Sequence, residues 1–84
     1  MKITLKLYAS LGQYLPVDAR RDNRMELEIE PGTPIDTVIA RFGLPANQVK
    51  LVLVDGHYVP PELRSSRVLI EGDTLAIWPP IAGG

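Results

Sequence analysis

The chain has 84 residues, of which 45% are hydrophobic and 23% are charged, with a formal net charge of -1 and no cysteine. This length allows one domain with a modest core and no deep catalytic cleft, and the lack of cysteine excludes disulfides, thiolate metal sites and a cysteine nucleophile. The near-neutral charge argues against nucleic acid as the main partner. No apolar run suggests a signal peptide or membrane span, so no membrane partner is expected, and the lack of cysteine fits the expected cytoplasmic location.

Two segments near the amino terminus alternate between apolar and polar residues, a pattern typical of half-buried β-strands. The first covers residues 2–8 and the second covers residues 25–30. Between them, Leu11, Tyr14 and Leu15 suggest one helical turn that ends at Pro16. Residues 18–24 are interpreted as a solvated loop, whose arginines could alternatively contact an acidic partner.

A single well-marked helix is predicted in the middle of the chain. Thr33 is a favourable N-cap and Pro34 suits the first helical position. Gly43 should end the helix by accepting a left-handed backbone. The apolar residues between these signals have the spacing of one helical face: Ile35, Val38, Ile39 and Phe42.

The second half of the chain contains short extended segments. Residues 49–54 form a continuous, valine-rich apolar run, which at this length favours a strand over a helix. Asp55-Gly56 is a hairpin signal, so residues 57–59 should return as a short strand. Residues 74–78 are predicted to form the last strand.

Several polar residues in this half are interpreted as structural rather than catalytic. The only histidine, His57, is expected to lie in the hairpin, and Asp73 is expected to supply a hydrogen bond within a turn. Glu62, Arg64 and Arg67 are expected to lie on a solvated connection.

The order strand, strand, helix, strand, strand, strand predicts the α+β class. Within that class we expect a β-grasp (ubiquitin-like) fold, with a mixed sheet of four to five strands and one main helix on one face. Residues 1–78 should form the domain, and residues 79–84 should form a flexible C-terminal tail, because the two prolines at its start cannot pair regularly.

The stretch from Gly72 to Gly84, GDTLAIWPPIAGG, resembles the C-terminus of the small subunit of molybdopterin synthase and its relatives, the MoaD/ThiS sulfur carriers. The segments KITLKLYASLG, PGTPIDTVIARFGL and LVLVDGHYV resemble other parts of these proteins, so the resemblance covers nearly the whole chain. The Pro-Pro-x-x-Gly-Gly ending favours molybdopterin-type over thiazole-type carriers. The chain departs from the pattern at Trp78, where a phenylalanine is common, and in its long first loop.

This resemblance implies a sulfur carrier that acts as a co-substrate, or as the small subunit of a molybdopterin synthase complex, and not as an enzyme on its own. It implies that an E1-like adenylyltransferase uses ATP and Mg²⁺ to adenylate the carboxylate of Gly84, which a sulfur donor converts to a thiocarboxylate. The acceptor would be the molybdopterin synthase large subunit, or an analogous enzyme of molybdopterin or tungstopterin biosynthesis. No bound cofactor or metal is expected.

The composition of the tail suits insertion into a partner. The tail consists of Pro79, Pro80, Ile81, Ala82, Gly83 and Gly84. The prolines stiffen its base and lower the entropy lost on insertion, and the glycines lack β-carbons and so can pass through a narrow channel. Fully extended, these residues reach about 20 Å. Ordinary terminal disorder is the alternative interpretation.

A docking surface is expected on the sheet face that the helix leaves open. Alternation places Leu51 and Leu53 on one side of their strand and Val52 and Val54 on the other. If the leucines pack on the helix, then Val52, Val54 and Trp78 form an exposed apolar patch that docks the activating enzyme and the acceptor subunit. Alternatively, the first loop folds over this face.

Three other functions stay open at this point. A ubiquitin-like modifier would use the same adenylation but end in an amide bond to a lysine of another protein. A carrier for tRNA thiolation or thiazole formation would pass its sulfur to a different acceptor. A plain β-grasp interaction module would not be activated at all.

Overall fold

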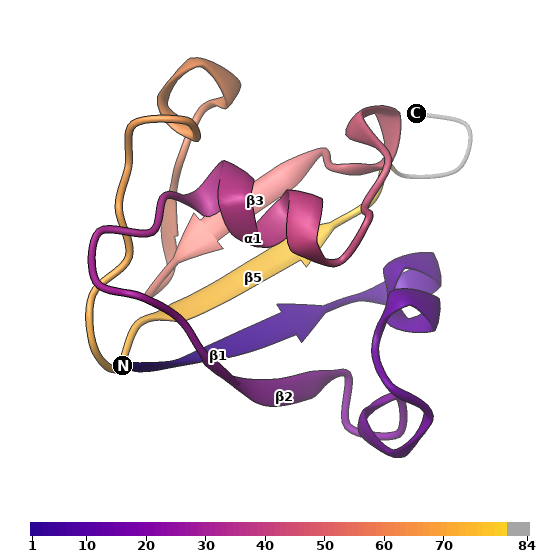
Figure 1. Ribbon diagram of the computed structural model, residues 1–84. Helices are drawn as coiled ribbons and strands as arrows, with labels where there is room; N and C mark the ends of the chain where they lie inside the picture. The colour runs from indigo at the N-terminus through magenta and orange to yellow at the C-terminus, as the bar shows by residue number, and fades with distance from the viewer. Residues whose placement is uncertain (81–84) are drawn as a thin grey trace.

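The fold is a mixed five-stranded sheet with one α-helix lying across one face (Figure 1). The computed structural model describes residues 1–80, and residues 81–84 lie outside the described part. The helix is α1 (Ile35–Arg41), and the strands are β1 (Lys2–Leu7), β2 (Arg24–Glu28), β3 (Leu51–Val54), β4 (His57–Tyr58) and β5 (Thr74–Trp78). Four short 3-10 helices lie in the connections: η1 (Ala9–Tyr14), η2 (Val17–Ala19), η3 (Ala46–Gln48) and η4 (Pro61–Leu63).

The last strand in sequence is the central strand of the sheet. The strand order is β2-β1-β5-β3-β4. Strand β5 runs parallel to β1 and antiparallel to β3, whereas the β1–β2 and β3–β4 pairs are antiparallel. This arrangement confirms the predicted α+β class and β-grasp fold.

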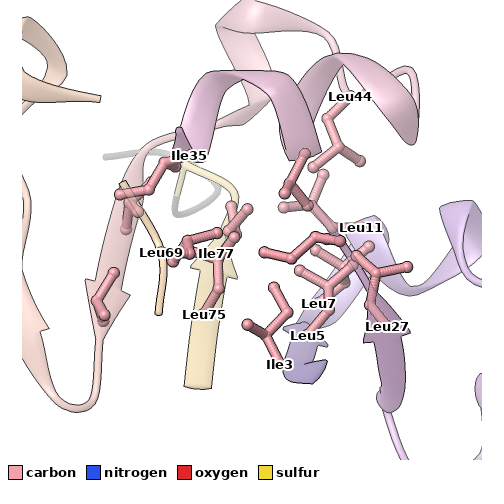
Figure 2. Close-up of a cluster of buried hydrophobic side chains, with 14 of the residues drawn as sticks. Ile3, Leu5, Leu7, Leu11, Leu27, Ile35, Leu44, Leu69, Leu75 and Ile77 are labelled. Carbon is pink, nitrogen blue, oxygen red and sulfur yellow. The ribbon is translucent and has the colours of Figure 1, made fainter. Parts of the chain in front are cut away.

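The core lies between α1 and the sheet face that it covers. Figure 2 shows Leu5, Leu7, Leu75 and Ile77 of the strands pointing into a cluster that Ile35 of α1 joins. All five side chains are fully buried. Burial of an aliphatic side chain of this size contributes about 1.5–3 kcal/mol, so this face of the sheet supplies most of the stabilising apolar contact.

The start of the helix differs from the prediction. The N-cap residue of α1 is Pro34, without a side-chain capping bond, so the expected Thr33 cap is wrong. The Thr33 hydroxyl instead donates to the carbonyl oxygen of Glu30 at 2.6 Å, within the preceding turn. Pro34 forms an isolated β-bridge with Val68, and this tertiary pairing holds it in an extended conformation.

Two predicted turns are confirmed by their backbone angles. Gly43 has a φ of 68° just beyond the end of α1, in the left-handed region that glycine tolerates. Asp55 and Gly56 have φ values of 49° and 82°, as a two-residue hairpin between β3 and β4 requires.

Within residues 1–80, no helix is long and apolar enough to span a membrane.

Candidate functional site

The strand that leads into the tail is held from both sides up to its last residue. The Lys50 amide donates to the Trp78 carbonyl oxygen at 3.0 Å, and the Tyr8 amide donates to the Ile77 carbonyl oxygen at 3.1 Å. The next residue, Pro79, has no N–H to continue the ladder. The chain therefore leaves the sheet at its centre, between the end of β1 and the start of β3.

Only the base of the predicted tail belongs to the described part of the chain. Pro79 is half-buried and Pro80 is exposed. The other tail residues lie outside the described range: Ile81, Ala82, Gly83 and Gly84. The role of Gly84 and the division of the chain after residue 78 therefore stay predictions.

The sheet face turned away from α1 carries apolar side chains close to this exit. In the β3–β5 register, Leu51 lies opposite Trp78 and Leu53 lies opposite Ala76. Cross-strand partners share a face, so these side chains form one surface. Tyr58, opposite Leu53 on β4, and Tyr8, stacked on Trp78, extend it. We call this surface the open-face patch: Tyr8, Leu51, Leu53, Tyr58, Ala76 and Trp78.

The patch is accessible at its β3–β4 side. Leu51 is 37% exposed and Tyr58 is 55% exposed. The first loop sends Leu11 and Leu15 into the core cluster, which Figure 2 shows for Leu11. An exposed apolar surface that contains tryptophan and tyrosine has the character of a binding surface.

The expected positions of Val52 and Val54 are wrong. Both valines are buried, at 0% and 1% exposure, and lie opposite Ile77 and Leu75 on the core face. The alternation itself was correct, but the run contains no polar residue from 51 to 54 to mark the solvent side. The register with β5 decides which side is buried. Trp78, by contrast, does lie on the open face and is half-buried.

One row of cross-strand partners runs across all five strands of the open face: Arg24, Lys6, Ala76, Leu53 and Tyr58. Its first two members are basic, and Arg24, expected in a loop, begins β2. Within residues 1–80, neither Lys6 nor Arg24 forms an ion pair. Two positive charges placed directly opposite each other on neighbouring strands repel, and a negative charge on a binding partner would relieve this repulsion. The open-face patch thus has a basic border of two residues, Lys6 and Arg24, at the end of the β1–β2 pair where Glu26 and Glu28 do not lie.

The remaining polar residues have structural roles, one of which sequence reasoning missed. His57 is exposed on β4, and the buried Asp73 accepts a hydrogen bond from the Ile70 amide at 2.9 Å, as predicted for a turn. Arg64, expected in solvent, is buried instead. No local sequence pattern marks it, because it lies in an irregular connection. Among residues 1–80, no group of three or more histidine, aspartate or glutamate side chains could hold a metal ion.

The sequence matches the profile of a family described as Mut7-C ubiquitin over residues 1–82. No curated protein matches it. Among solved structures, SAMP1 from Haloferax volcanii is 18% identical, with all of both chains covered and a TM-score of 0.67.

Two further structures bear names from molybdopterin biosynthesis. A putative molybdopterin converting factor, subunit 1, from Pyrococcus furiosus is 19% identical, covers 95% of this chain and 98% of its own, and has a TM-score of 0.68. A chain from the complex of subunits 1 and 2 of the Helicobacter pylori molybdopterin-converting factor is 10% identical, with both chains fully covered and a TM-score of 0.61. These likenesses confirm the ubiquitin-like fold.

Proposed function

The chain belongs to the Mut7-C ubiquitin family, and from this premise we propose that it is a sulfur carrier activated at the carboxylate of Gly84. The observation that carries the proposal is the path of the chain. Strand β5, paired on both sides, ends at Trp78 within the open-face patch, and the sequence that follows it is Pro-Pro-Ile-Ala-Gly-Gly. The likeness to molybdopterin converting factor subunits supports molybdopterin or tungstopterin biosynthesis as the pathway.

The proposed chemistry needs only a free α-carboxylate from this chain. That group is ionised at neutral pH, and one of its oxygens attacks the α-phosphorus of ATP while pyrophosphate leaves. A sulfide-equivalent donor then attacks the acyl carbon, and AMP leaves, so that the chain ends in a thiocarboxylate. This route divides one difficult substitution into two easier ones. ATP and Mg²⁺ belong to the activating enzyme, and the carrier is its co-substrate.

The open-face patch is the proposed docking surface for the E1-like enzyme and for the acceptor enzyme. It replaces the patch of Val52, Val54 and Trp78, since only Trp78 of these three is on the open face. The partner surface should be apolar at its centre, with carboxylates opposite Lys6 and Arg24. The Helicobacter pylori complex of subunits 1 and 2 supports a second subunit of this kind as the acceptor.

The direct test combines this protein with a candidate E1-like enzyme, ATP, Mg²⁺ and labelled pyrophosphate. We expect exchange of label into ATP that is lost when Gly84 is deleted. With a sulfur donor present, the intact mass should change by the replacement of one oxygen with one sulfur. The emission of Trp78 confirms that the deletion variant is folded. Pyrophosphate exchange that persists without Gly84 would reject the proposal. So would the absence of exchange when every E1-like enzyme of the source organism has been tested with the wild-type protein.

A ubiquitin-like modifier is the second candidate, favoured by the family's description as a ubiquitin. It would share the adenylation step but transfer the acyl group to an amine, with loss of AMP. Covalent adducts of this chain on lysines of other proteins, dependent on Gly84, would identify it. A thiocarboxylate without such adducts would identify the carrier.

A further inference from the structure

Arg64 is a buried cation that forms no ion pair within residues 1–80. It follows η4 in the connection between β4 and β5, and only 6% of it is exposed. Its guanidinium donates to three backbone carbonyl oxygens: Nε to Val59 at 3.1 Å, Nη1 to Val49 at 3.4 Å and Nη2 to Lys50 at 3.2 Å. The side chain therefore joins the end of the hairpin to the segment that enters β3.

An apolar side chain would fill this space without the cost of removing a charge from water. The particular contribution of an arginine is a rigid fork of donors that can hold several acceptors at fixed angles. Bonds from a charged donor are also stronger than bonds between neutral groups. The contacts of Arg64 thus indicate that the position of the held carbonyl groups matters.

Lys50 connects these contacts to the tail. Its carbonyl oxygen accepts from Arg64, and its amide donates to the Trp78 carbonyl oxygen at 3.0 Å. Arg64 is itself braced, because its own carbonyl oxygen accepts from the Asp36 amide of α1 at 3.0 Å. A continuous chain of hydrogen bonds therefore runs from the helix through Arg64 and Lys50 to the last residue before Pro79.

We propose that Arg64 is a positioning residue for the tail. It acts through the two peptide groups on either side of the Lys50 α-carbon to hold the Trp78 carbonyl, and so sets the direction in which the chain leaves the sheet. The consequence for activation rests on the proposed function. A tail with a fixed base enters a partner's pocket in fewer wrong orientations. Loss of the Arg64 side chain should therefore lower the rate of adenylation. It should leave docking through the open-face patch unchanged.

The first test is amide hydrogen exchange at the two ends of the β3–β5 ladder. The Lys50 amide bonds to Trp78 at the tail end, and the Asp55 amide bonds to Thr74 at the other end, at 2.9 Å. In Arg64→Leu, we expect exchange at Lys50 to accelerate about tenfold or more relative to Asp55, because the opening is local. Equal acceleration of both amides indicates a merely global loss of stability and would overturn the proposal.

Two variants complete this test. Arg67→Leu makes the same chemical change in the same connection at an exposed position, and should leave both amides unchanged. Arg64→Lys keeps the positive charge, and it replaces Arg64→Leu in the hydrogen exchange test if the leucine variant does not fold. One ammonium cannot span three carbonyl groups, so Lys50 should still exchange faster relative to Asp55.

The second test is kinetic and uses the pyrophosphate exchange assay. Arg64→Lys should lower kcat with an unchanged KM for the carrier. The reverse pattern, a raised KM with unchanged kcat, would place Arg64 in docking and overturn the positioning role. If the wild-type protein supports no exchange with any E1-like enzyme, the proposed function fails, and the hydrogen exchange result still decides the coupling of Arg64 to Trp78.

Discussion

The indole ring of Trp78 lies flat against the phenol ring of Tyr8, with 4.3 Å between ring centroids and 6° between ring planes. Tyr8 directly follows β1, and Trp78 is the last residue of β5. Because β1 and β5 are parallel, both rings lie at the end of the sheet where the tail begins. The stack thus joins the open-face patch to the base of the tail.

Removing the Tyr8 ring should affect both stability and the environment of Trp78. Tyr8→Ala should lower the free energy of unfolding by about 0.5–1.5 kcal/mol beyond the effect of lost apolar area, because the stacking contact is gone. The emission of the single tryptophan should move to longer wavelength as water reaches the indole. Urea unfolding followed by this emission measures both effects. Tyr8→Phe keeps the ring and should resemble the wild type; unchanged emission in Tyr8→Ala would contradict the stack.

Adjacent residues of β3 should respond oppositely to the same substitution. Val52→Asp places a carboxylate among the apolar core side chains and should cost about 3 kcal/mol or more, because a charge is removed from water there. Leu51→Asp places the same carboxylate on the open face and should cost less than about 1 kcal/mol. Equilibrium unfolding in urea compares the two. A larger cost at Leu51 would mean that the two faces of β3 are reversed.

The features that could be predicted are those marked by local chemistry. In β1, polar residues alternate with Ile3, Leu5 and Leu7, so the pattern identifies both the strand and its buried side. Gly43 and the Asp55-Gly56 pair mark positions where the backbone must enter the left-handed region. Such signals depend only on residues adjacent in sequence, so the local conformation that they predict is the one found in the folded protein.

The features that could not be predicted depend on register between distant segments. The apolar run of β3 fits the core with either face, and only its pairing with β5 buries Val52. The stack of Tyr8 on Trp78 requires the parallel pairing of the first and last strands. Arg64 reaches the Lys50 carbonyl oxygen, 14 residues away in sequence, only when its connection folds back on the start of β3. No short sequence window contains both halves of these contacts.

A close approach at Gly12 leads to a prediction of energetic coupling. The Asn23 side chain donates from Nδ2 to the Leu7 carbonyl oxygen at 2.9 Å, and a β-carbon on Gly12 would lie 2.9 Å from that nitrogen. Gly12→Ala should therefore displace the amide and cost about 1 kcal/mol. In an Asn23→Gly background, which tolerates the φ of 55° at this position, the same substitution should cost less.

A double-mutant cycle by urea unfolding measures this coupling between Gly12 and Asn23. The two single variants, the double variant and the wild type supply its four corners. Costs that simply add would show that the Gly12 backbone does not pack against the Asn23 amide.

The basic border and the apolar centre of the open-face patch should control different steps of partner binding. Lys6→Glu should slow association with the activating enzyme and reduce its dependence on salt, because steering between opposite charges is lost. Leu51→Ala should mainly speed dissociation and weaken binding by about 1–2 kcal/mol, as truncation of an apolar contact at the centre of an interface does. Stopped-flow measurements of Trp78 emission at low and high salt give both rate constants.

Lys2→Glu is the matched control, because it makes the same charge change on the same face at the far end of β1, opposite Glu28. If the net charge of the whole molecule controlled association, Lys2→Glu and Lys6→Glu would slow it equally. If the local basic border controls it, only Lys6→Glu should have a large effect. Faster association of Lys6→Glu would mean that the partner's rim is basic, contrary to the carboxylates that we expect opposite Lys6 and Arg24. The comparison therefore separates steering by the patch from steering by the whole molecule, whose formal net charge of -1 supplies little field of its own.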